Sequence, residues 1–330
     1  MPEVQGEGAH EVLGRGRTRH EEASAGRARL RAVDKPCRVG IVRSPHRPES
    51  GPLADEAAAV ARGRGVDVWE ASSWDLTEVD PCLDGTDVVL CFGGDGTLIR
   101  AARVASPHGV PVAGVNLGRV GFLAEFAPDD MGPGWQALLD GNYWVEERVT
   151  LQIDHQRQGE RIGSHLAIND AVVGRGPANH IVRLNTWVGG QYLTSFAADG
   201  LLIATPTGST GSNLASGGPV IPPDMAVLVL TPVLPFVSFR NPLVFGASTQ
   251  IDVQVSLGSA PAGKEAVLSV DGGPAVAVQD GDRLTFRGGP MLARFARVRA
   301  RNYFHASLVP KLQRGTLLTP LAPDTPSPDG

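Results

Sequence analysis

The chain has 330 residues, of which 42% are hydrophobic, so it is long enough to form two domains that each bury a core. Its 30 basic and 35 acidic residues give a net charge of −5, which argues against nucleic acid or an anionic membrane as the main partner. The cysteines number 3 and have no C-x-x-C spacing, so neither a disulfide framework nor a zinc site is predicted. These features are typical of a cytoplasmic protein, and we expect that location.

Polar segments form both ends of the given sequence. Residues 1–34 mix basic and acidic side chains without an apolar face, and residues 315–330 are rich in proline, so both are predicted to be disordered tails. The first segment has neither the apolar core of a secretory signal nor the acid-poor composition of a mitochondrial presequence. The most apolar window, residues 226–239, is short and contains Pro232 and Pro235, so no membrane-spanning helix is expected.

The first half of the chain between these segments has the pattern of an α/β domain. Apolar runs such as residues 86–92 and 110–116 alternate with helical patterns such as residues 53–65 and 98–105. Apolar strands that alternate with helices predict an open, mostly parallel sheet that is covered on both faces. We expect this α/β domain to span residues 35–148.

Beyond Arg148 the helical patterns nearly vanish. Short β-rich segments follow one another, from residues 149–156 to residues 282–288, with turn signals between them. This pattern predicts an all-β domain at residues 149–290.

A glycine-rich loop follows the apolar run at residues 86–92. Residues 93–97 read Gly-Gly-Asp-Gly-Thr and are expected at the carboxyl end of a strand, where open α/β sheets bind ligands. The backbone N–H groups of such a loop, together with the N-terminus of the next helix, suit a phosphate. Asp95 would repel that phosphate unless it holds Mg²⁺ or accepts a proton from an attacking hydroxyl. The plainer alternative is a tight turn without a ligand.

A second loop combines glycine with hydroxyl side chains. It begins with Asp199, which precedes an apolar strand, and it ends near Val220. Its hydroxyl side chains belong to Thr205, Thr207, Ser209, Thr210 and Ser212. Hydroxyl and N–H groups at this density suit phosphate and ribose oxygens, although a polar surface turn is the simpler alternative. A third glycine-containing stretch, residues 114–126, has Asn116 at a predicted strand end.

The order and spacing of five motifs resemble the NAD kinase family over about residues 37–312. The motifs are GGDGT (93–97), VNLGRVGFL (115–123), IND (168–170), DGLLIATPTGST (199–210) and SVDGG (269–273). The resemblance implies an α/β domain, a β-rich domain and a segment at residues 291–314 that returns to the first domain. It also implies phosphorylation of the 2′-hydroxyl of the adenosine ribose of NAD. The expected cofactors are ATP, or another phosphoryl donor, and Mg²⁺, and the expected assembly is a homodimer or homotetramer.

The resemblance also assigns roles to individual residues. Asp95 corresponds to the acid that activates the acceptor hydroxyl. The residues expected to bind the phosphates of ATP are Gly93, Gly94, Gly96, Thr97 and Ser209. The residues expected to bind the acceptor are Asn116, Phe122, Asn169, Asp170, Asp199, Thr207, Thr210, Ser212 and Phe236. No protein ligand for a metal is assigned.

Three departures from the family pattern lie on the acceptor side. Ser212 stands where the family usually has tyrosine, Asp170 where it has glutamate, and Phe236 where a histidine is expected. Loss of an aromatic stacking partner costs about 1–3 kcal/mol, which weakens NAD binding without excluding it. The departures leave two alternatives open. One is a related kinase for another hydroxyl acceptor, such as a nucleoside, a nucleotide or a natural-product intermediate, and the other is a nucleotide-binding regulatory protein without catalysis.

Several other conspicuous side chains are predicted to be structural. Trp135 and Trp144 lie near an apolar helical pattern and are expected to pack rather than to stack on a ligand, and His108 is expected in a loop. The basic segment at residues 294–304 has two interpretations, a contact with phosphate or a solvated strand face.

Overall fold

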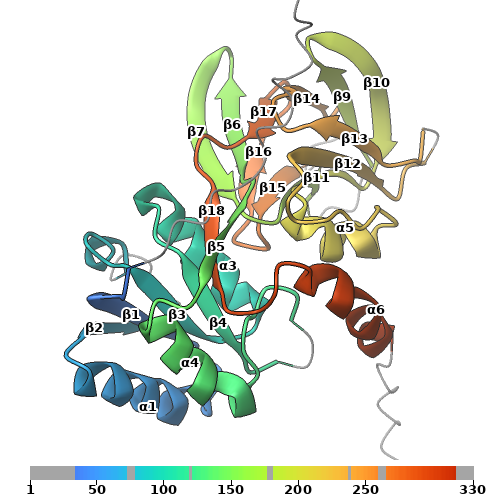
Figure 1. Ribbon diagram of the computed structural model, residues 1–330. Helices are drawn as coiled ribbons and strands as arrows, with labels where there is room; N and C mark the ends of the chain where they lie inside the picture. The colour runs from blue at the N-terminus through green and yellow to red at the C-terminus, as the bar shows by residue number, and fades with distance from the viewer. Residues whose placement is uncertain are drawn as a thin grey trace, which may run out of the picture. The chain divides into compact units, whose positions relative to one another are not determined.

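Figure 1 shows the chain as a computed structural model. The described residues are 34–72, 79–118, 121–176, 181–236, 239–258 and 265–316. Both predicted tails lie almost entirely outside these ranges, as do residues 119–120 of the third motif. The last helix, α6 (Tyr303–Thr316), extends past residue 314, where the sequence predicts that the folded part ends. Among the described residues, none of the helices is long and apolar enough to cross a membrane.

The N-terminal part is built on a six-stranded sheet in the order β2-β1-β3-β4-β18-β5. Its strands are β1 (Arg38–Arg43), β2 (Asp67–Ser72), β3 (Val88–Gly93), β4 (Val112–Asn116), β5 (Trp144–Arg148) and β18 (Ala293–Arg297). Strands β1 to β4 pair in parallel, whereas β5 runs antiparallel to β18. The late strand β18 pairs with both β4 and β5, so a segment from near the end of the chain completes this sheet.

Helices cover both faces of this sheet. They are α1 (Ser50–Gly63), α3 (Asp95–Ala105) and α4 (Met131–Leu139), with short 3-10 turns η1 (Asp80–Cys82), η2 (Ser106–His108) and η3 (Pro128–Asp130). Successive residues of β3 face opposite sides: Leu90 packs with α1 and α4, and Cys91 packs with α3. Burial on both faces explains why β3 reads as a continuous apolar run, and the predicted α/β architecture is confirmed.

The C-terminal part consists of two six-stranded antiparallel sheets, ordered β10-β9-β14-β17-β6-β7 and β13-β12-β11-β8-β15-β16. The strands of the first sheet are β6 (Leu151–Arg157), β7 (Glu160–Ala167), β9 (Val182–Val188), β10 (Gln191–Ala198), β14 (Ile251–Ser256) and β17 (Arg283–Gly288). Those of the second are β8 (Asp170–Arg175), β11 (Gly200–Ala204), β12 (Val227–Val233), β13 (Leu243–Gly246), β15 (Ala266–Val270) and β16 (Val276–Val278). Side chains from both sheets, such as Phe286 and Leu201, form one hydrophobic core, so the all-β prediction is confirmed.

One contact joins these two parts close to several predicted site residues. Ile168, two residues before the start of β8, is fully buried in the same hydrophobic cluster as Leu98 of α3 and Phe295 of β18. This packing holds the chain at Asn169 and Asp170 against the α/β part.

Candidate active site

The loop between β3 and α3 is open to a ligand. Gly93 ends β3, Gly94 caps α3, and Asp95 is the first helical residue. A Cβ on Gly94 or Gly96 would meet no atom within 4 Å, whereas a Cβ on Gly93 would lie 2.3 Å from the hydroxyl of Thr97. The first N–H groups of a helix have no partner within the helix and carry the positive end of its dipole. This loop therefore offers backbone N–H groups to an anion.

The Asp95 carboxylate is oriented by two backbone N–H groups. The N–H of Phe122 donates to Oδ2 at 2.8 Å, and the N–H of Leu123 donates to Oδ1 at 3.2 Å. A Cβ on Gly121 would lie 2.9 Å from Asp95 Oδ1 and 3.1 Å from Asn116 Oδ1, so glycine there lets both side chains approach. A carboxylate has about four lone-pair sites. The two hydrogen bonds therefore leave Asp95 able to accept a proton from a bound hydroxyl.

The pair Asn169 and Asp170 is fixed by Asp271. The Asp271 carboxylate accepts the N–H groups of Ile168 at 2.9 Å, Asn169 at 2.7 Å and Asp170 at 3.2 Å, and it lies 3.8 Å from Arg103 of α3. Burial and the neighbouring Asp271 carboxylate raise the pKa of Asp170 to about 6. Within the described chain the buried Oδ1 of Asn169 has no hydrogen-bond partner, so a hydroxyl or amino group of a ligand can donate to it.

The second glycine loop packs directly onto this pair. It contains η4 (Thr207–Thr210) and α5 (Ser212–Ala215). The N–H of Thr205 donates to the Asn169 carbonyl oxygen at 2.8 Å, and a Cβ on Gly208 would lie 2.2 Å from the same oxygen. The Ser212 hydroxyl bonds the Asp170 carboxylate. The loop and the Asn169-Asp170 pair therefore form one continuous surface.

The hydroxyl side chains of this loop point in different directions. Thr210 is half-buried, and the buried Thr207 accepts a hydrogen bond of 3.4 Å from Arg148 Nη1. Ser209 is fully buried, and its Oγ accepts the N–H of Ile221 at 3.0 Å. This placement does not support a direct phosphate contact by Ser209. The residue instead fixes the loop from beneath.

Asp199 and Phe236 lie away from this group within one chain. In the pairing of β8 with β11, Ala204 at the end of β11 lies opposite Asp170, whereas Asp199 precedes the start of β11. At about 3.3 Å per residue, roughly 16 Å of strand separates Asp199 from Ala204. The structure therefore does not bring these two predicted acceptor residues together with Asp95.

The surroundings of Asp199 and Phe236 also differ from those of Asp95. The Asp199 carboxylate lies 3.0 Å from Arg175. The N–H of Phe236 donates to the Ala197 carbonyl oxygen at 2.8 Å, and the Phe236 side chain is 70% exposed. This end of β11 therefore presents a paired carboxylate and an exposed aromatic ring.

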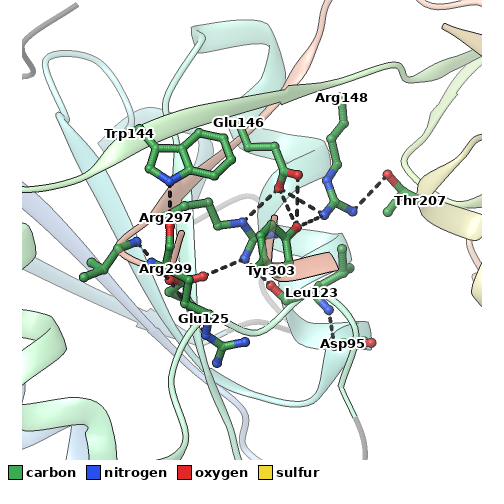
Figure 2. Close-up of polar contacts among 11 residues, drawn as sticks. Asp95, Leu123, Glu125, Trp144, Glu146, Arg148, Thr207, Arg297, Arg299 and Tyr303 are labelled. Atoms are coloured by element: carbon green, nitrogen blue, oxygen red, sulfur yellow. Dashed lines mark hydrogen bonds and ion pairs between the residues drawn. The ribbon is translucent and has the colours of Figure 1, made fainter. Parts of the chain in front are cut away.

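A buried ionic network behind the β3–α3 loop was missed by the sequence analysis (Figure 2). Glu146 of β5 accepts hydrogen bonds from Arg148 at 3.0 Å, Arg297 of β18 at 2.9 Å and Tyr303 of α6 at 3.0 Å. Burial alone would raise the pKa of Glu146, but Arg148 and Arg297 hold it below its ordinary value. For Arg297, the interpretation of the basic segment as a solvated face is wrong, because the side chain is fully buried and also pairs with Glu125 at 3.2 Å.

Leu123 connects this network to Asp95. Its carbonyl oxygen accepts a 2.7 Å hydrogen bond from Arg297 Nη1, while its N–H donates to Asp95, as Figure 2 shows. The ionic network therefore anchors the segment that orients the Asp95 carboxylate. The sequence indicates only the basic segment at residues 294–304. It does not indicate the carboxylate partners of that segment, because Glu125 and Glu146 lie in separate segments far from it along the chain.

The described residues include no group of three or more His, Cys, Asp or Glu side chains that could hold a metal ion. Magnesium commonly binds through one or two carboxylates together with substrate phosphates rather than in an all-protein cage. The open loop around Asp95 fits that mode better than a dedicated metal site.

Comparison with known proteins identifies the family. The sequence profile of the ATP-NAD kinase N-terminal domain matches residues 39–143, and that of the ATP-NAD kinase C-terminal domain matches residues 168–298. An NAD kinase from Dehalococcoides mccartyi is 34% identical over 277 residues, which cover 84% of this chain and 96% of the relative. The chain belongs to the ATP-NAD kinase family. The resemblance inferred from five motifs is confirmed, and the chain is a phosphotransferase that acts on a hydroxyl group.

Other relatives of this kinase agree. An NAD kinase from Desulforamulus reducens is 37% identical over 218 residues, which cover 66% of this chain and 74% of the relative. The structure of yeast NADH kinase complexed with NADH shares the fold, with a TM-score of 0.71, 22% identity, and coverage of 84% of this chain and 87% of that one. So does an NAD kinase from Archaeoglobus fulgidus in complex with ATP, with a TM-score of 0.66, 23% identity, and coverage of 84% and 99%.

Proposed function

We propose that this kinase transfers the γ-phosphoryl group of ATP to the 2′-hydroxyl of the adenosine ribose of NAD, which gives NADP. The observation that carries the proposal is the open β3–α3 loop, in which the Asp95 carboxylate stands among glycines with room for a ligand. The names of the relatives support NAD as the acceptor. The nucleotides in the titles of the neighbouring structures, NADH and ATP, support nucleotide substrates.

In the proposed reaction Asp95 is the general base. Its carboxylate accepts the proton of the 2′-hydroxyl as the hydroxyl oxygen forms a bond to the γ-phosphorus. The bond between that phosphorus and the bridging oxygen breaks, and ADP leaves with the electron pair. The backbone N–H groups of Gly94 to Gly96, at the N-terminus of α3, stabilise charge on the phosphates. A positioned base of this kind contributes about 10²–10⁴-fold to the rate.

The Asn169-Asp170 pair and the second loop bind the acceptor in this proposal. The unpartnered Oδ1 of Asn169 and the carboxylate of Asp170 accept hydrogen bonds from ribose hydroxyls or from the adenine amino group. Thr210 and Ser212 line the same surface. Asn116 and Phe122 complete the group from the α/β part, next to Asp95.

The separate position of Asp199 and Phe236 supports an oligomer. We propose a homodimer or homotetramer in which these residues serve the acceptor site of a neighbouring subunit. The exposed ring of Phe236, next to the 74% exposed Leu234, provides an apolar contact for that subunit. We propose no protein ligand for Mg²⁺, which would be held mainly by the phosphates of ATP and would offset their charge. The reaction takes place in the cytoplasm.

The alternative acceptors have less support. They rest on the three departures at Ser212, Asp170 and Phe236, and two of these, Ser212 and Asp170, bond each other beside Asn169. The relatives' names give no support to another acceptor or to a regulator without catalysis. The retained loop around Asp95 also argues against the regulator.

The test is an acceptor panel. The protein is incubated with ATP, Mg²⁺ and NAD, NADH, nucleosides or 2′-deoxy-NAD, and phosphorylated products are measured by mass. We expect NADP with kcat/KM of about 10⁴ M⁻¹s⁻¹ or higher for NAD, which is ordinary for enzymes, and no product from 2′-deoxy-NAD. Preferred phosphorylation of another acceptor, or the absence of any transfer, would overturn the proposal.

A further inference from the structure

Helix α6 is held against the active site at its first turn. The Tyr303 hydroxyl bonds Glu146 at 3.0 Å and accepts a 2.6 Å hydrogen bond from Arg148, and the neighbouring Phe304 is buried. Lys311 follows Phe304 by seven residues, so the two side chains lie on one face of the helix. The anchored first turn therefore directs Lys311 toward the α/β part.

The Lys311 ammonium lies beside the segment that orients Asp95. Its Nζ is 5.3 Å from the centre of the Phe122 ring, and the Phe122 N–H donates to Asp95 at 2.8 Å. The Lys311 and Asp95 charges also attract each other. A residue near the end of the described chain thus brings a positive charge to the group that is to receive a proton.

Lys311 differs from the other cations near this site. Arg148 and Arg297 are paired with the carboxylates of Glu146 and Glu125, whereas in the described part of the chain Lys311 contacts a ring rather than a carboxylate. Burial, and then the charge of Arg299, lower the pKa of Lys311 to about 8, and Arg297 and Arg148 act in the same direction while Asp95 opposes them. An anion that bound beside Lys311 would stabilise its charged form.

We propose that Lys311 contacts the phosphoryl group during its transfer and is a further substrate-binding residue of this kinase. The inference rests on the proposed function, because the hydroxyl that loses its proton to Asp95 must touch the phosphorus it attacks. The phosphoryl oxygens then lie next to Asp95, where the Lys311 ammonium offsets their charge. Lysine supplies a compact point charge on a flexible stem, which suits a group that moves from donor to acceptor.

The experiment compares Lys311→Gln, Lys311→Arg and the matched control Lys35→Gln, whose side chain is exposed near the start of the described chain. Loss of one preorganised charge contact lowers kcat by about 10²–10³-fold, so we expect that loss in Lys311→Gln. ATP binding weakens in the same variant, while NAD affinity and the melting temperature stay at the wild-type values. Lys35→Gln leaves all four quantities unchanged.

The pH profile separates a phosphate contact from a structural role. In the wild type kcat/KM for ATP falls above about pH 8, because the free enzyme loses the Lys311 proton there. Arginine stays protonated at every accessible pH. Lys311→Arg therefore retains activity at alkaline pH, where the wild type loses it. If Lys311 had only a structural role, Lys311→Arg would lower the melting temperature, and its activity would still fall above about pH 8.

Each contrary outcome is distinct. Wild-type kcat and ATP affinity in Lys311→Gln would overturn the inference, and so would a selective loss of NAD affinity. If the wild type forms no NADP but phosphorylates another acceptor, the proposed function fails and the same variants are compared on that acceptor. If the wild type phosphorylates none of the acceptors, the ATP dissociation constants of the wild type and Lys311→Gln are compared. Equal constants overturn the inference.

Discussion

The two glycine loops of this kinase look alike in sequence and differ in what glycine does. In the β3–α3 loop a Cβ on Gly94 or Gly96 would meet nothing within 4 Å. In the second loop a Cβ on Gly208 would lie 2.2 Å from the Asn169 carbonyl oxygen. Glycine gives a ligand access to the backbone in the first loop, and it allows one backbone to pack on another in the second.

The polar side chains repeat this contrast. Asp95 is half-buried and keeps lone pairs free beyond its two backbone hydrogen bonds. Ser209 is fully buried and uses its hydroxyl within its own loop. A cluster of hydroxyl residues therefore marks a loop that is held rigidly, and only some of its members face the ligand.

Gly208→Ala is expected to break the second loop. The new Cβ would overlap backbone atoms of Asn169 that cannot move aside, so the free energy of unfolding should fall by about 3 kcal/mol, the upper end for overpacked sites. Chemical denaturation measures this change, with Gly96→Ala as the matched control. Equal stability of the two variants would contradict the packing role of Gly208.

Asp170→Asn is expected to remove a pH dependence of stability. Burial and Asp271 raise the folded-state pKa of Asp170 from 3.8 to about 6, so the folded protein binds more protons than the unfolded one between these values. Its contribution to stability is complete below about pH 4 and is lost as the pH rises through about 6, and it amounts to roughly 2–3 kcal/mol.

Urea unfolding at pH values on both sides of this window measures the effect. Asp199→Asn is the control, because Asp199 is partly exposed and paired with Arg175. The same pH slope in the wild type and in Asp170→Asn would contradict the assignment.

Ser209→Ala is expected to lower the stability of the second loop without changing the phosphoryl-transfer step. Removal of the hydroxyl leaves the buried N–H of Ile221 without its acceptor, which costs about 1–2 kcal/mol of stability. Turnover per folded molecule should be unchanged. A raised KM for ATP at unaltered stability would instead restore Ser209 as a phosphate ligand. Ser248→Ala, at an exposed position outside this loop, is the control for stability.

Gly96→Ala is expected to give the smallest change. Its Cβ would enter open space on the ligand side of the first loop, so the KM for ATP should rise about tenfold, or about 1.4 kcal/mol. Stability should stay equal or increase, since alanine is the better helix former by about 0.5–1 kcal/mol. Steady-state kinetics and denaturation measure both quantities. Unfolding of this variant would show that the first loop is packed rather than open.

The first loop could be predicted from sequence because its signals are local. The continuous apolar run of β3, the glycines and the start of α3 are adjacent in the chain, and each follows from short-range backbone rules. The direction of each hydroxyl in the second loop could not, because Ser209 meets Ile221 only after the loop has folded onto Asn169.

The contacts that the end of the chain makes with the rest of the site also could not be predicted from the sequence. Arg297 pairs with Glu146 across 151 positions, and Tyr303 meets Glu146 across 157. Nothing in a run of basic residues distinguishes a buried arginine from a solvated one until the partner carboxylates are located. For the same reason the sequence alone does not single out Lys311 or Asp271 as site residues, although Asp271 belongs to the SVDGG motif at residues 269–273.

The central claim is that Asp95 acts as the base in an open phosphate loop, and Asp95→Asn tests it most directly. Turnover of ATP and NAD is compared with the wild type, and the affinity for each nucleotide is measured by calorimetry. Because asparagine keeps the shape and removes the proton acceptor, kcat should fall by about 10²–10⁴-fold while both affinities stay near the wild-type values. Near wild-type turnover in Asp95→Asn, or loss of nucleotide binding together with activity, would contradict the account.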